Sequence, residues 1–360
     1  MAQIDAFFKM MNDLGASDLH LSSGSQPVIR LHGDMQRVKY KTLDHDELKK
    51  MLYEIAPEAK AKEFEESGDI DFSYEVPKMA RYRVNFFLQR RGIAAVFREI
   101  PEKILTIDDL GLPPILRKLA HLPKGLVLVT GPTGSGKSTT LAAIMDYANR
   151  SRKDHVLTIE DPIEFVHEPI HCLINQREVG RDTKSFQAAL RGALREDPDI
   201  ILVGEMRDLE TIQLALEAAE TGHLVFGTLH TISASKTIDR IIEVFPGNLQ
   251  GQIRSGLADS LKSVVAQNLF KRTDKPGRVA ALEILIATPA VRNLIRENKI
   301  YQINSTIETG RKFGMQSLDD AIMDLLKKKI IDPEAAYNKA VNKGKFRDFL
   351  AEPPEDFTEF

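Results

Sequence analysis

Hydrophobic and polar residues follow two different periods within residues 1–100. Apolar residues recur at helical spacing in residues 3–14 and 46–62. Elsewhere they alternate with polar residues, as in half-buried strands, in residues 28–35, 69–76, 81–89 and 92–99. The first of these runs is expected to be a hairpin with a Gly-Asp turn. Helices mixed with hairpins predict a small α+β domain over residues 1–100.

Prolines mark the end of this domain, because residues 101–114 carry several of them and are interpreted as an interdomain linker. Beyond the linker, short apolar runs alternate with helical patterns, which is typical of a parallel α/β sheet. The expected strands are residues 125–130, 155–160, 200–203 and 224–229, and the expected helices are residues 138–149, 184–195 and 210–220. We therefore predict an α/β domain over residues 115–288.

Helical patterns dominate the rest of the chain. The predicted helices are residues 233–244, 248–270, 289–297, 302–313, 317–327 and 333–341, with a last strand at residues 279–286. Residues 289–360 are expected to form a C-terminal helical region that ends in a frayed acidic tail, residues 352–360.

A glycine-rich segment, Gly131–Ser138, follows the first strand of the α/β domain and fits the P-loop pattern G-x-x-x-x-G-K-[ST]. Glycines let backbone N–H groups curl around phosphate oxygens, and a helix N-terminus adds unpaired N–H groups and a positive dipole. Lys137 is expected to reach the β- and γ-phosphates of ATP, and the Ser138 hydroxyl to bind Mg²⁺. The alternative is a glycine turn that fits the pattern by chance. The predicted strand before the segment and the predicted helix after it argue against this alternative. The predicted nucleotide-binding residues are Thr133, Gly134, Ser135, Gly136, Lys137, Ser138 and Thr139.

Polar residues follow three other predicted strands, at the sheet edge where ligands bind in α/β folds. Glu160 ends the second strand, and Asp161 and Glu164 follow it. The three carboxylates suit Mg²⁺ or the attacking water, with a solvated acidic turn as the alternative. Glu205 follows the third strand and is the best candidate for a general base. His230 ends the fourth strand, where it could hydrogen-bond a γ-phosphate, and it lacks zinc ligands at metal-binding spacing.

Arginines occupy one face of a predicted strand in the N-terminal domain. Period-two spacing puts Arg81 and Arg83 opposite Tyr82, and Arg98 ends the next strand. These side chains could bind the phosphates of a nucleotide that is held elsewhere. On the residues alone, a solvated polar face is the favoured alternative.

Composition limits the possible functions. The chain has 360 residues and a formal net charge of −3, so a large core is possible and no general affinity for polyanions is implied. One cysteine, Cys172, allows neither an intrachain disulfide nor a cysteine-ligated zinc cluster and indicates a reducing compartment. The N-terminus lacks the pattern of a signal peptide, and no apolar run approaches the roughly 18 residues of a membrane span. We therefore expect a cytosolic protein that could dock on a membrane complex.

Four motifs together resemble those of the secretion ATPase superfamily. Its Walker A, Asp box, Walker B and His box are similar to Gly131–Ser138, Thr158–Glu164, Arg195–Asp208 and Thr221–Thr231. Within this superfamily, the chain is similar to the ATPases that retract bacterial type IV pili, through the segments Gly15–Leu21, Arg177–Gly180 and Ala290–Glu297. The chain departs from the Walker B pattern at Gly204, which stands where a metal-binding Asp is usual.

The resemblance implies an N-terminal PAS-like α+β domain, a RecA-like P-loop ATPase domain with C-terminal helices, and a homohexameric ring that uses ATP and Mg²⁺. It makes Glu205 the catalytic glutamate, Glu164 the Asp-box carboxylate and His230 the His-box histidine. It also implies that Arg83 and Arg98 approach the nucleotide. The implied setting is the cytoplasmic side of the inner membrane at the pilus base, with a pilus platform protein and a paralogous retraction ATPase as candidate partners.

Three alternatives fit parts of the pattern. A pilus assembly or type II secretion ATPase typically carries a cysteine-ligated zinc element, whereas this chain has one cysteine. An accessory retraction ATPase is a close paralogue that a complementation test would separate. A RecA-like nucleic-acid translocase is the alternative of another class. No nucleic acid is expected as a partner, because the net charge is near neutral and no aromatic and basic strand-binding segment is evident.

Overall fold

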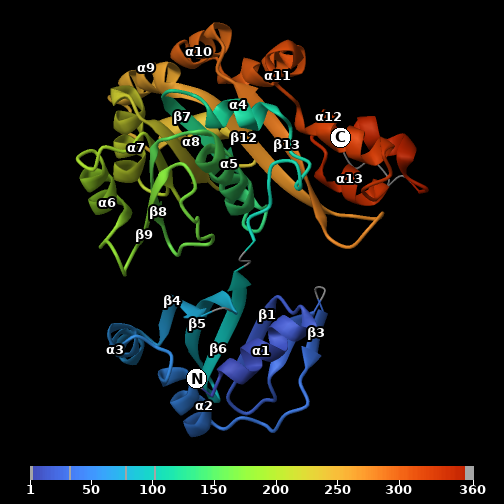
Figure 1. The fold of residues 1–360 in the computed structure, drawn as a ribbon. Coiled ribbons are helices and arrows are strands. Elements are labelled where there is room, and N and C mark those ends of the chain that lie inside the picture. Colours follow the sequence, from blue (N-terminus) through green and yellow to red (C-terminus); the bar gives the residue numbers. More distant parts are fainter. Residues whose placement is uncertain (1–2, 32–33, 78, 101–102, 353–360) are drawn as a thin grey trace. The chain divides into compact units, whose positions relative to one another are not determined.

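The structure is a computed structural model that describes residues 3–31, 34–77, 79–100 and 103–352. Residue contacts divide the chain into two compact units: Met1–Lys103 with Pro162–Val166, and Ile104–Asp161 with His167–Phe360. Each unit is built on its own β-sheet (Figure 1). None of the helices in the described part of the chain has the length and apolarity that a bilayer crossing requires.

The first unit contains a six-stranded antiparallel sheet in the order β3-β2-β1-β6-β5-β4. Its strands are β1 (Asp18–Ser22), β2 (Val28–Leu31), β3 (Asp34–Arg37), β4 (Asp69–Val76), β5 (Ala80–Gln89) and β6 (Gly92–Ile100). Its helices are α1 (Asp5–Leu14), α2 (His45–Tyr53) and α3 (Glu58–Ser67). The predicted hairpin at residues 28–35 is confirmed by the pairing of β2 with β3, and Gly33 of its predicted turn lies outside the described residues.

Alternation along β5 separates the core face of this sheet from its polar face. Tyr82, Val84 and Phe86 are at most 1% exposed. Phe8 of α1 stacks on Tyr82 with ring centroids 4.1 Å apart, so α1 covers the core face. Because side chains alternate along a strand, Arg83 lies on the opposite face, as the sequence pattern predicted.

The single helix predicted over residues 46–62 is wrong. The helix α2 ends at Tyr53, and α3 begins after Pro57. Proline lacks the backbone N–H that a continuing helix needs, and it disfavours helical backbone in the residue before it. The helix α3 then continues to Ser67, where Gly68 ends it in the left-handed conformation with φ of 74°.

The second unit contains a seven-stranded sheet in the order β13-β12-β7-β11-β10-β8-β9, parallel except for the pair β12–β13. Its strands are β7 (Gly125–Thr130), β8 (His155–Glu160), β9 (Leu173–Glu178), β10 (Ile200–Val203), β11 (Leu224–Leu229), β12 (Leu261–Lys271) and β13 (Arg278–Ile286). Its main helices are α4 (Ile115–Ala120), α5 (Lys137–Ser151), α6 (Phe186–Ala193), α7 (Leu209–Thr221), α8 (Ala234–Glu243), α9 (Gln250–Ser260) and α10 (Pro289–Arg296).

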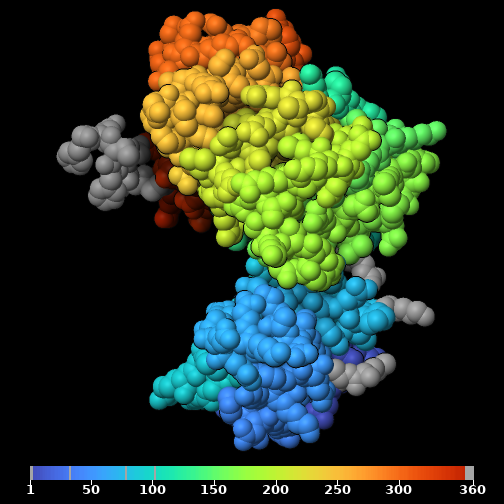
Figure 2. Space-filling view, turned by 90° about the vertical axis from the view of Figure 1, so that its left-hand side faces the viewer, coloured from blue at the N-terminus to red at the C-terminus, as the bar shows by residue number. Residues whose placement is uncertain are grey.

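Helices cover both faces of this sheet. Leu126 and Leu128 of β7 pack in one apolar cluster with residues of α6, α7, α8 and α9. Val127 and Val129, on the other face of the strand, pack with α4 and α5. The three layers confirm the predicted α/β class and bring the loops after β7, β8, β10 and β11 to one edge (Figure 1). The helices α9 and α10 lie side by side on one surface of the unit (Figure 2).

The single helix predicted over residues 248–270 is also wrong. The helix α9 ends at Ser260, and the chain continues directly as β12 between β7 and β13. The polar residue Ser263 is fully buried there because its hydroxyl donates to the Leu285 carbonyl, at 2.8 Å. The sequence analysis also missed the edge strand β9 and the short helix α4.

The C-terminal region consists of short helices packed beside β13. The predicted helix over residues 302–313 is instead the 3₁₀ turn Ile300–Gln302, the helix α11 (Ile303–Thr309) and the 3₁₀ turn Arg311–Phe313. Gly310 interrupts it, and a Cβ atom at Gly310 would lie 2.3 Å from the sulfur of Met315. The helices α12 (Leu318–Lys327) and α13 (Pro333–Lys339) follow, then the 3₁₀ segment Lys343–Phe349. Residues 353–360 of the predicted acidic tail lie outside the described residues.

Candidate functional site: the P-loop edge and the arginine row

The loop between β7 and α5 has the backbone of a phosphate cradle. Gly131, Gly134 and Gly136 have φ angles of 143°, 76° and 86°, which side-chain-bearing residues rarely adopt. Gly136 is the N-cap of α5, and the first turn of a helix leaves N–H groups without helical partners. The described geometry therefore presents backbone N–H groups and the positive end of a helix dipole, which together favour an anion.

Lys137 begins α5 and folds back over the loop. Its ammonium donates to the Gly131 carbonyl at 2.9 Å and to the Pro132 carbonyl at 3.2 Å. A lysine ammonium has three donors on a flexible stem, so it can exchange such carbonyls for phosphate oxygens. Lys137 is therefore held over the loop in which the sequence predicts the phosphates.

Gln267 lies beside the P-loop and was not predicted from the sequence. It lies in β12, is 2% exposed and bonds both the loop and α5. The pattern assigned its segment to a helix, and no local motif marks it. The only signal in the sequence was a pair of polar residues, Gln267 and Asn268, between apolar neighbours.

Glu205 follows the end of β10 and pairs with two side chains, those of Arg207 and His230. Its Oε1 atom lies 2.5 Å from Nε of Arg207 and 2.8 Å from Nε2 of His230. Burial raises the pKa of the Glu205 carboxyl, but the Arg207 hydrogen bond and the charges of Arg207 and His230 outweigh burial and lower the pKa below its usual 4.5. Glu205 is therefore an ionised acceptor at neutral pH. The structure brings together Glu205 and His230, two of the residues predicted for the site.

Gly204 has a physical reason to lack the side chain of a Walker B aspartate. Its N–H donates to the Ile159 carbonyl at 2.8 Å, and its carbonyl accepts from the Thr228 hydroxyl at 2.5 Å. A Cβ atom at Gly204 would lie 3.1 Å from the Ile159 oxygen and 3.2 Å from Cα of Glu160. Strand ends β8 and β11 therefore hold this position tightly, and an aspartate would need the backbone of β8 to move.

The three acidic residues at and beyond the end of β8 have different surroundings. Glu160 is held by the Thr158 hydroxyl at 2.6 Å and the Gln176 amide at 3.2 Å. Asp161 lies near enough to Arg207 to raise the pKa of that guanidinium, behind the larger effect of Glu205. Glu164 is half-buried and falls within Pro162–Val166, which groups with the first unit. Among the described residues, these carboxylates therefore form no cluster that could hold a metal ion by itself.

Charged side chains form a row across the first unit's sheet. In register, Arg30 of β2 faces Asp18 of β1, Asp18 faces Arg98 of β6, and Arg98 faces Arg83 of β5. We call these four residues the arginine row. Asp18 bonds Nε of Arg98 at 2.8 Å and lies 3.6 Å from Nε of Arg30. Arg83 lies 3.8 Å from the exposed Asp71 carboxylate.

Asp18 is the buried member of the arginine row, with a side chain that is 5% exposed. Burial raises the pKa of its carboxyl, but hydrogen bonds from Arg98 and Ser17 and the charge of Arg98 hold the pKa below its usual 3.8. The carboxylate therefore stays ionised and fixes the guanidinium of Arg98, whose side chain is 68% exposed. The exposed arginines of this face are a ready anion-binding surface.

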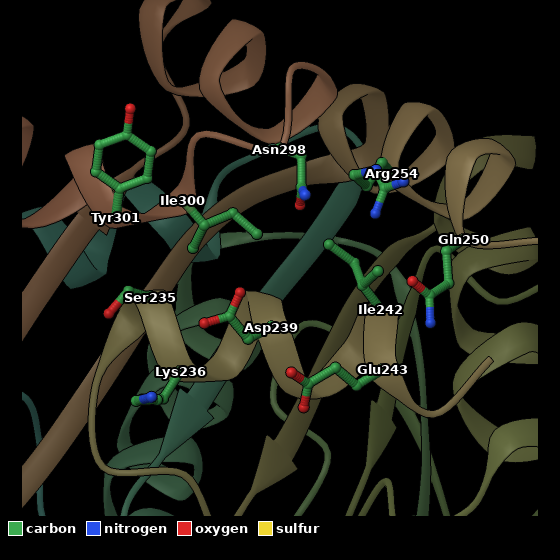
Figure 3. Close-up of a pocket in the computed structure, with 10 residues that line it drawn as sticks. All are labelled: Ser235, Lys236, Asp239, Ile242, Glu243, Gln250, Arg254, Asn298, Ile300 and Tyr301. Atoms are coloured by element: carbon green, nitrogen blue, oxygen red, sulfur yellow. The ribbon is translucent and has the colours of Figure 1, made fainter. Parts of the chain in front are cut away.

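A cavity of about 500 Å³ lies elsewhere in the second unit, between α8, α9 and the turn that follows α10 (Figure 3). Acidic Asp239 and Glu243 and basic Lys236 and Arg254 line it. Burial and the neighbouring Glu243 raise the pKa of Asp239. Neither Lys137 nor Glu205 borders this cavity, so it is not the P-loop site.

The donor set at the P-loop suits a metal that arrives with a nucleotide. Across the described residues, no group of three or more His, Cys, Asp and Glu side chains is arranged to hold a metal ion. Ser138 offers one hydroxyl in the first turn of α5. Mg²⁺ is commonly held by one or two protein oxygens together with substrate phosphates and waters. The residues present therefore fit Mg²⁺ bound with ATP better than a resident metal ion.

Comparisons with known proteins identify the family. The family model described as Type II/IV secretion system protein matches residues 2–328. The chain is 59% identical over 326 residues to the type IV pilus retractation ATPase PilT of Pseudomonas aeruginosa, covering 91% of this chain and 94% of that protein. It is 37% identical over 323 residues to the type IV pilus ATPase PilU of the same organism, covering 90% and 85%.

A solved structure, of the pilus retraction motor PilT with bound ADP, matches with a TM-score of 0.88 and 44% identity over 96% of this chain and 98% of that chain. Similarity at this level extends over both units, so it does not depend on the P-loop motif alone. The chain is a member of the Type II/IV secretion system protein family.

Proposed function

We propose that this protein is an ATP-hydrolysing motor that retracts type IV pili. The observation that carries the proposal is the P-loop edge, where Lys137 lies over a glycine cradle and the ionised Glu205 pairs with His230 at the ends of neighbouring strands. The names of PilT and PilU and the ADP bound in the PilT structure support ATP as the substrate. The test is twitching motility in a retraction-deficient strain that is complemented with this chain, together with ATP hydrolysis by the purified protein.

In the proposed reaction, the loop backbone and Lys137 bind the β- and γ-phosphates, and Ser138 binds the Mg²⁺ that ATP brings. Mg²⁺ would neutralise charge that develops on the phosphates. A carboxyl with a lowered pKa is a weak proton acceptor, because an effective general base has a pKa near the working pH. We therefore assign Glu205 chiefly to orienting the attacking water, with His230 holding Glu205 and sensing the γ-phosphate.

In this proposal, the arginine row supplies the positive charge that stabilises the γ-phosphate during hydrolysis. Arg83 and Arg98 approach the γ-phosphate of a nucleotide bound by another RecA-like domain in a homohexameric ring, while Glu164 acts as the Asp-box carboxylate. Loss of the γ-phosphate then releases the contacts that held a PAS-like N-terminal domain to the nucleotide. We propose domain limits of 1–100, 115–288 and 289–360, with residues 101–114 as the linker between the first two.

The domain movements that follow ATP hydrolysis would act on a pilus platform protein in the inner membrane, from the cytoplasmic side at the pilus base. An accessory retraction ATPase remains the second candidate, and the higher identity to PilT, 59% against 37% for PilU, favours the main motor. Complementation separates the two, because an accessory protein restores twitching only in a strain that lacks the accessory gene. ATP hydrolysis stimulated by single-stranded DNA would instead support a nucleic-acid translocase.

Asp18→Asn tests whether the arginine row is held in place for catalysis. We expect ATP hydrolysis to fall about tenfold, because a hydrogen bond from Arg98 to a charged partner is replaced by a weaker one to a neutral amide. The matched control is Asp71→Asn. Its carboxylate is exposed and lies 3.8 Å from Arg83, so this change should have little effect. Equal ATP hydrolysis by the two variants would show that Asp18 does not position Arg98 for catalysis.

The lowered pKa of Asp18 also predicts how stability depends on pH. The ionised carboxylate stabilises the folded protein above its unfolded pKa of about 3.8, and this contribution is lost as pH falls through the lower folded pKa. The difference in urea midpoint between the wild type and Asp18→Asn should therefore be constant from pH 5 to 8 and shrink below about pH 4. A difference that grows below pH 4 would contradict the assignment.

The helix α10 offers a test of coupling between hydrolysis and retraction. Arg292 donates to the Ala287 carbonyl at 3.0 Å, and Arg296 pairs with Asp259 of α9, so both side chains brace α10. We expect Arg292→Ala combined with Arg296→Ala to leave ATP hydrolysis within about threefold of wild type and to impair twitching strongly. Colony spreading and phosphate release measure the two effects. Parallel losses in both would make α10 part of the ATPase core.

A further inference from the structure

The side chain of Gln267 bridges two parts of the phosphate-binding segment. Its Nε2 atom donates to the Ser135 carbonyl at 2.6 Å, and its Oε1 atom accepts from the Thr140 hydroxyl at 2.7 Å. Gln267 is 2% exposed and Thr140 is also 2% exposed, so both bonds are protected from water. One buried amide thus joins the end of the loop to the first turns of α5.

The backbone around Gln267 also limits the loop. A Cβ atom at Gly131 would lie 2.4 Å from the Gln267 carbonyl oxygen. A Cβ atom at Gly136 would lie 2.8 Å from Nε2 of Gln267. Both glycines that define the P-loop pattern therefore pack against the same residue of β12. A side chain at either glycine would push the loop off this strand.

The chemistry of the partners fixes which way the amide of Gln267 points. The Ser135 carbonyl can only accept a hydrogen bond, so the amide nitrogen must face it. The Thr140 hydroxyl then donates to the amide oxygen. Replacing the amide by a carboxylate of the same shape would keep the Thr140 bond and bring an oxygen against the Ser135 carbonyl.

We propose that Gln267 is a positioning residue that aims the P-loop backbone at the phosphates. In a trans peptide the N–H group points opposite to the carbonyl of the same unit. Because Gln267 draws the Ser135 carbonyl toward β12, the N–H group of Gly136 points away from β12. This inference rests on the proposed function, since it assumes that the loop binds ADP and ATP.

The proposal predicts a particular kinetic pattern. The P-loop backbone contacts the phosphates before, during and after hydrolysis, so a misaimed loop loses binding in all of these states. The KM for ATP should rise by a larger factor than kcat falls. A change at Glu205, which acts on the attacking water, should show the opposite pattern.

The test is Gln267→Glu, compared with the matched control Gln316→Glu. Gln316 donates its amide to the Leu282 carbonyl at 2.9 Å, and Leu282 is the residue that pairs with Gln267 across β12 and β13. Titration with a fluorescent ADP analogue measures the affinity, and thermal unfolding without nucleotide measures stability. We expect Gln267→Glu to raise the Kd for ADP roughly ten- to a hundredfold and Gln316→Glu to change it less than about twofold.

The outcomes separate this inference from the proposed function. If the wild-type protein does not bind ADP, the proposed function fails. If the wild type binds ADP and folded Gln267→Glu binds it equally well, Gln267 has only a structural role. Should Gln267→Glu not fold, Thr140→Val removes the other hydrogen bond of the amide and should raise the Kd about fivefold. An unchanged Kd in Thr140→Val would overturn the proposal.

Discussion

Glu205→Gln is expected to reduce ATP hydrolysis by about 10²-fold while ATP still binds, because a misplaced attacking water costs a factor of this order. The substitution keeps the size of the side chain and removes the negative charge that accepts from Arg207 and His230. Binding should survive because the loop and Lys137, rather than Glu205, contact the phosphates in this proposal. Single-turnover hydrolysis and the affinity for fluorescent ATP, measured on the same preparation, give the two quantities.

Glu210→Gln is a matched control for this change. Glu210 is also a carboxylate after β10, but it lies in the first turn of α7 and pairs with the exposed Arg191. Its replacement should leave turnover within about twofold of wild type, as for other surface ion pairs. A Glu205→Gln protein that unfolds at the wild-type temperature but binds no ATP would assign Glu205 to nucleotide or metal binding instead.

The ionisation of Glu205 also limits the pH profile. Arg207 and His230 hold the pKa of this carboxyl below 4.5, so it is fully ionised from pH 6 to 8. Over this range the carboxylate itself should contribute no pH dependence to kcat. Any pH dependence of kcat in this window would have to come from a group other than the Glu205 carboxylate.

Local patterns predicted much of the second sheet. The strands β7, β10 and β11 are completely buried runs, and each is followed by a helix, so period and length identified them. The strand β12 was not predicted, because polar Ser263 and Gln267 interrupt its apolar pattern. Their hydrogen-bond partners, the carbonyls of Leu285 and Ser135, belong to other segments of the chain. Such tertiary satisfaction of polar groups leaves no local trace in the sequence.

The candidate site shows the same division between local and distant information. The spacing from Gly131 to Ser138 identified the phosphate loop, and strand ends identified Glu205 and His230. Gln267 could not be found in this way, because it reaches the loop only through the pairing of β12 with β7. The reason for Gly204 was equally hidden, since it depends on the closeness of Ile159 and Glu160 on β8.

Removing both Arg83 and Arg98 is expected to lower ATP hydrolysis by about 10³–10⁵-fold, the usual value of an arginine supplied to a phosphoryl-transfer site. This corresponds to roughly 4–7 kcal/mol of activation free energy. Arginines that merely face solvent would contribute almost nothing. The control is Arg91→Ala, which removes a cation near the turn of the same hairpin, where the Arg91 side chain donates to the exposed Gly24 carbonyl. Steady-state phosphate release distinguishes arginines that act on the phosphates from arginines that only face solvent.

Subunit mixing decides whether these arginines act on a neighbouring copy. Chains with Arg83→Ala and Arg98→Ala are combined with Glu205→Gln chains, and we expect each kind of chain to be inactive alone. If the arginines act in trans in the proposed ring, some interfaces of a mixed ring join an intact P-loop to an intact arginine row, so activity partly returns. If they act within their own chain, every site in the mixed ring lacks one component. Activity that stays at background in rings shown by native mass spectrometry to be mixed would therefore exclude the role in trans. The register of the arginine row makes the double substitution informative, because Arg83 and Arg98 are direct cross-strand partners and either could cover for the other.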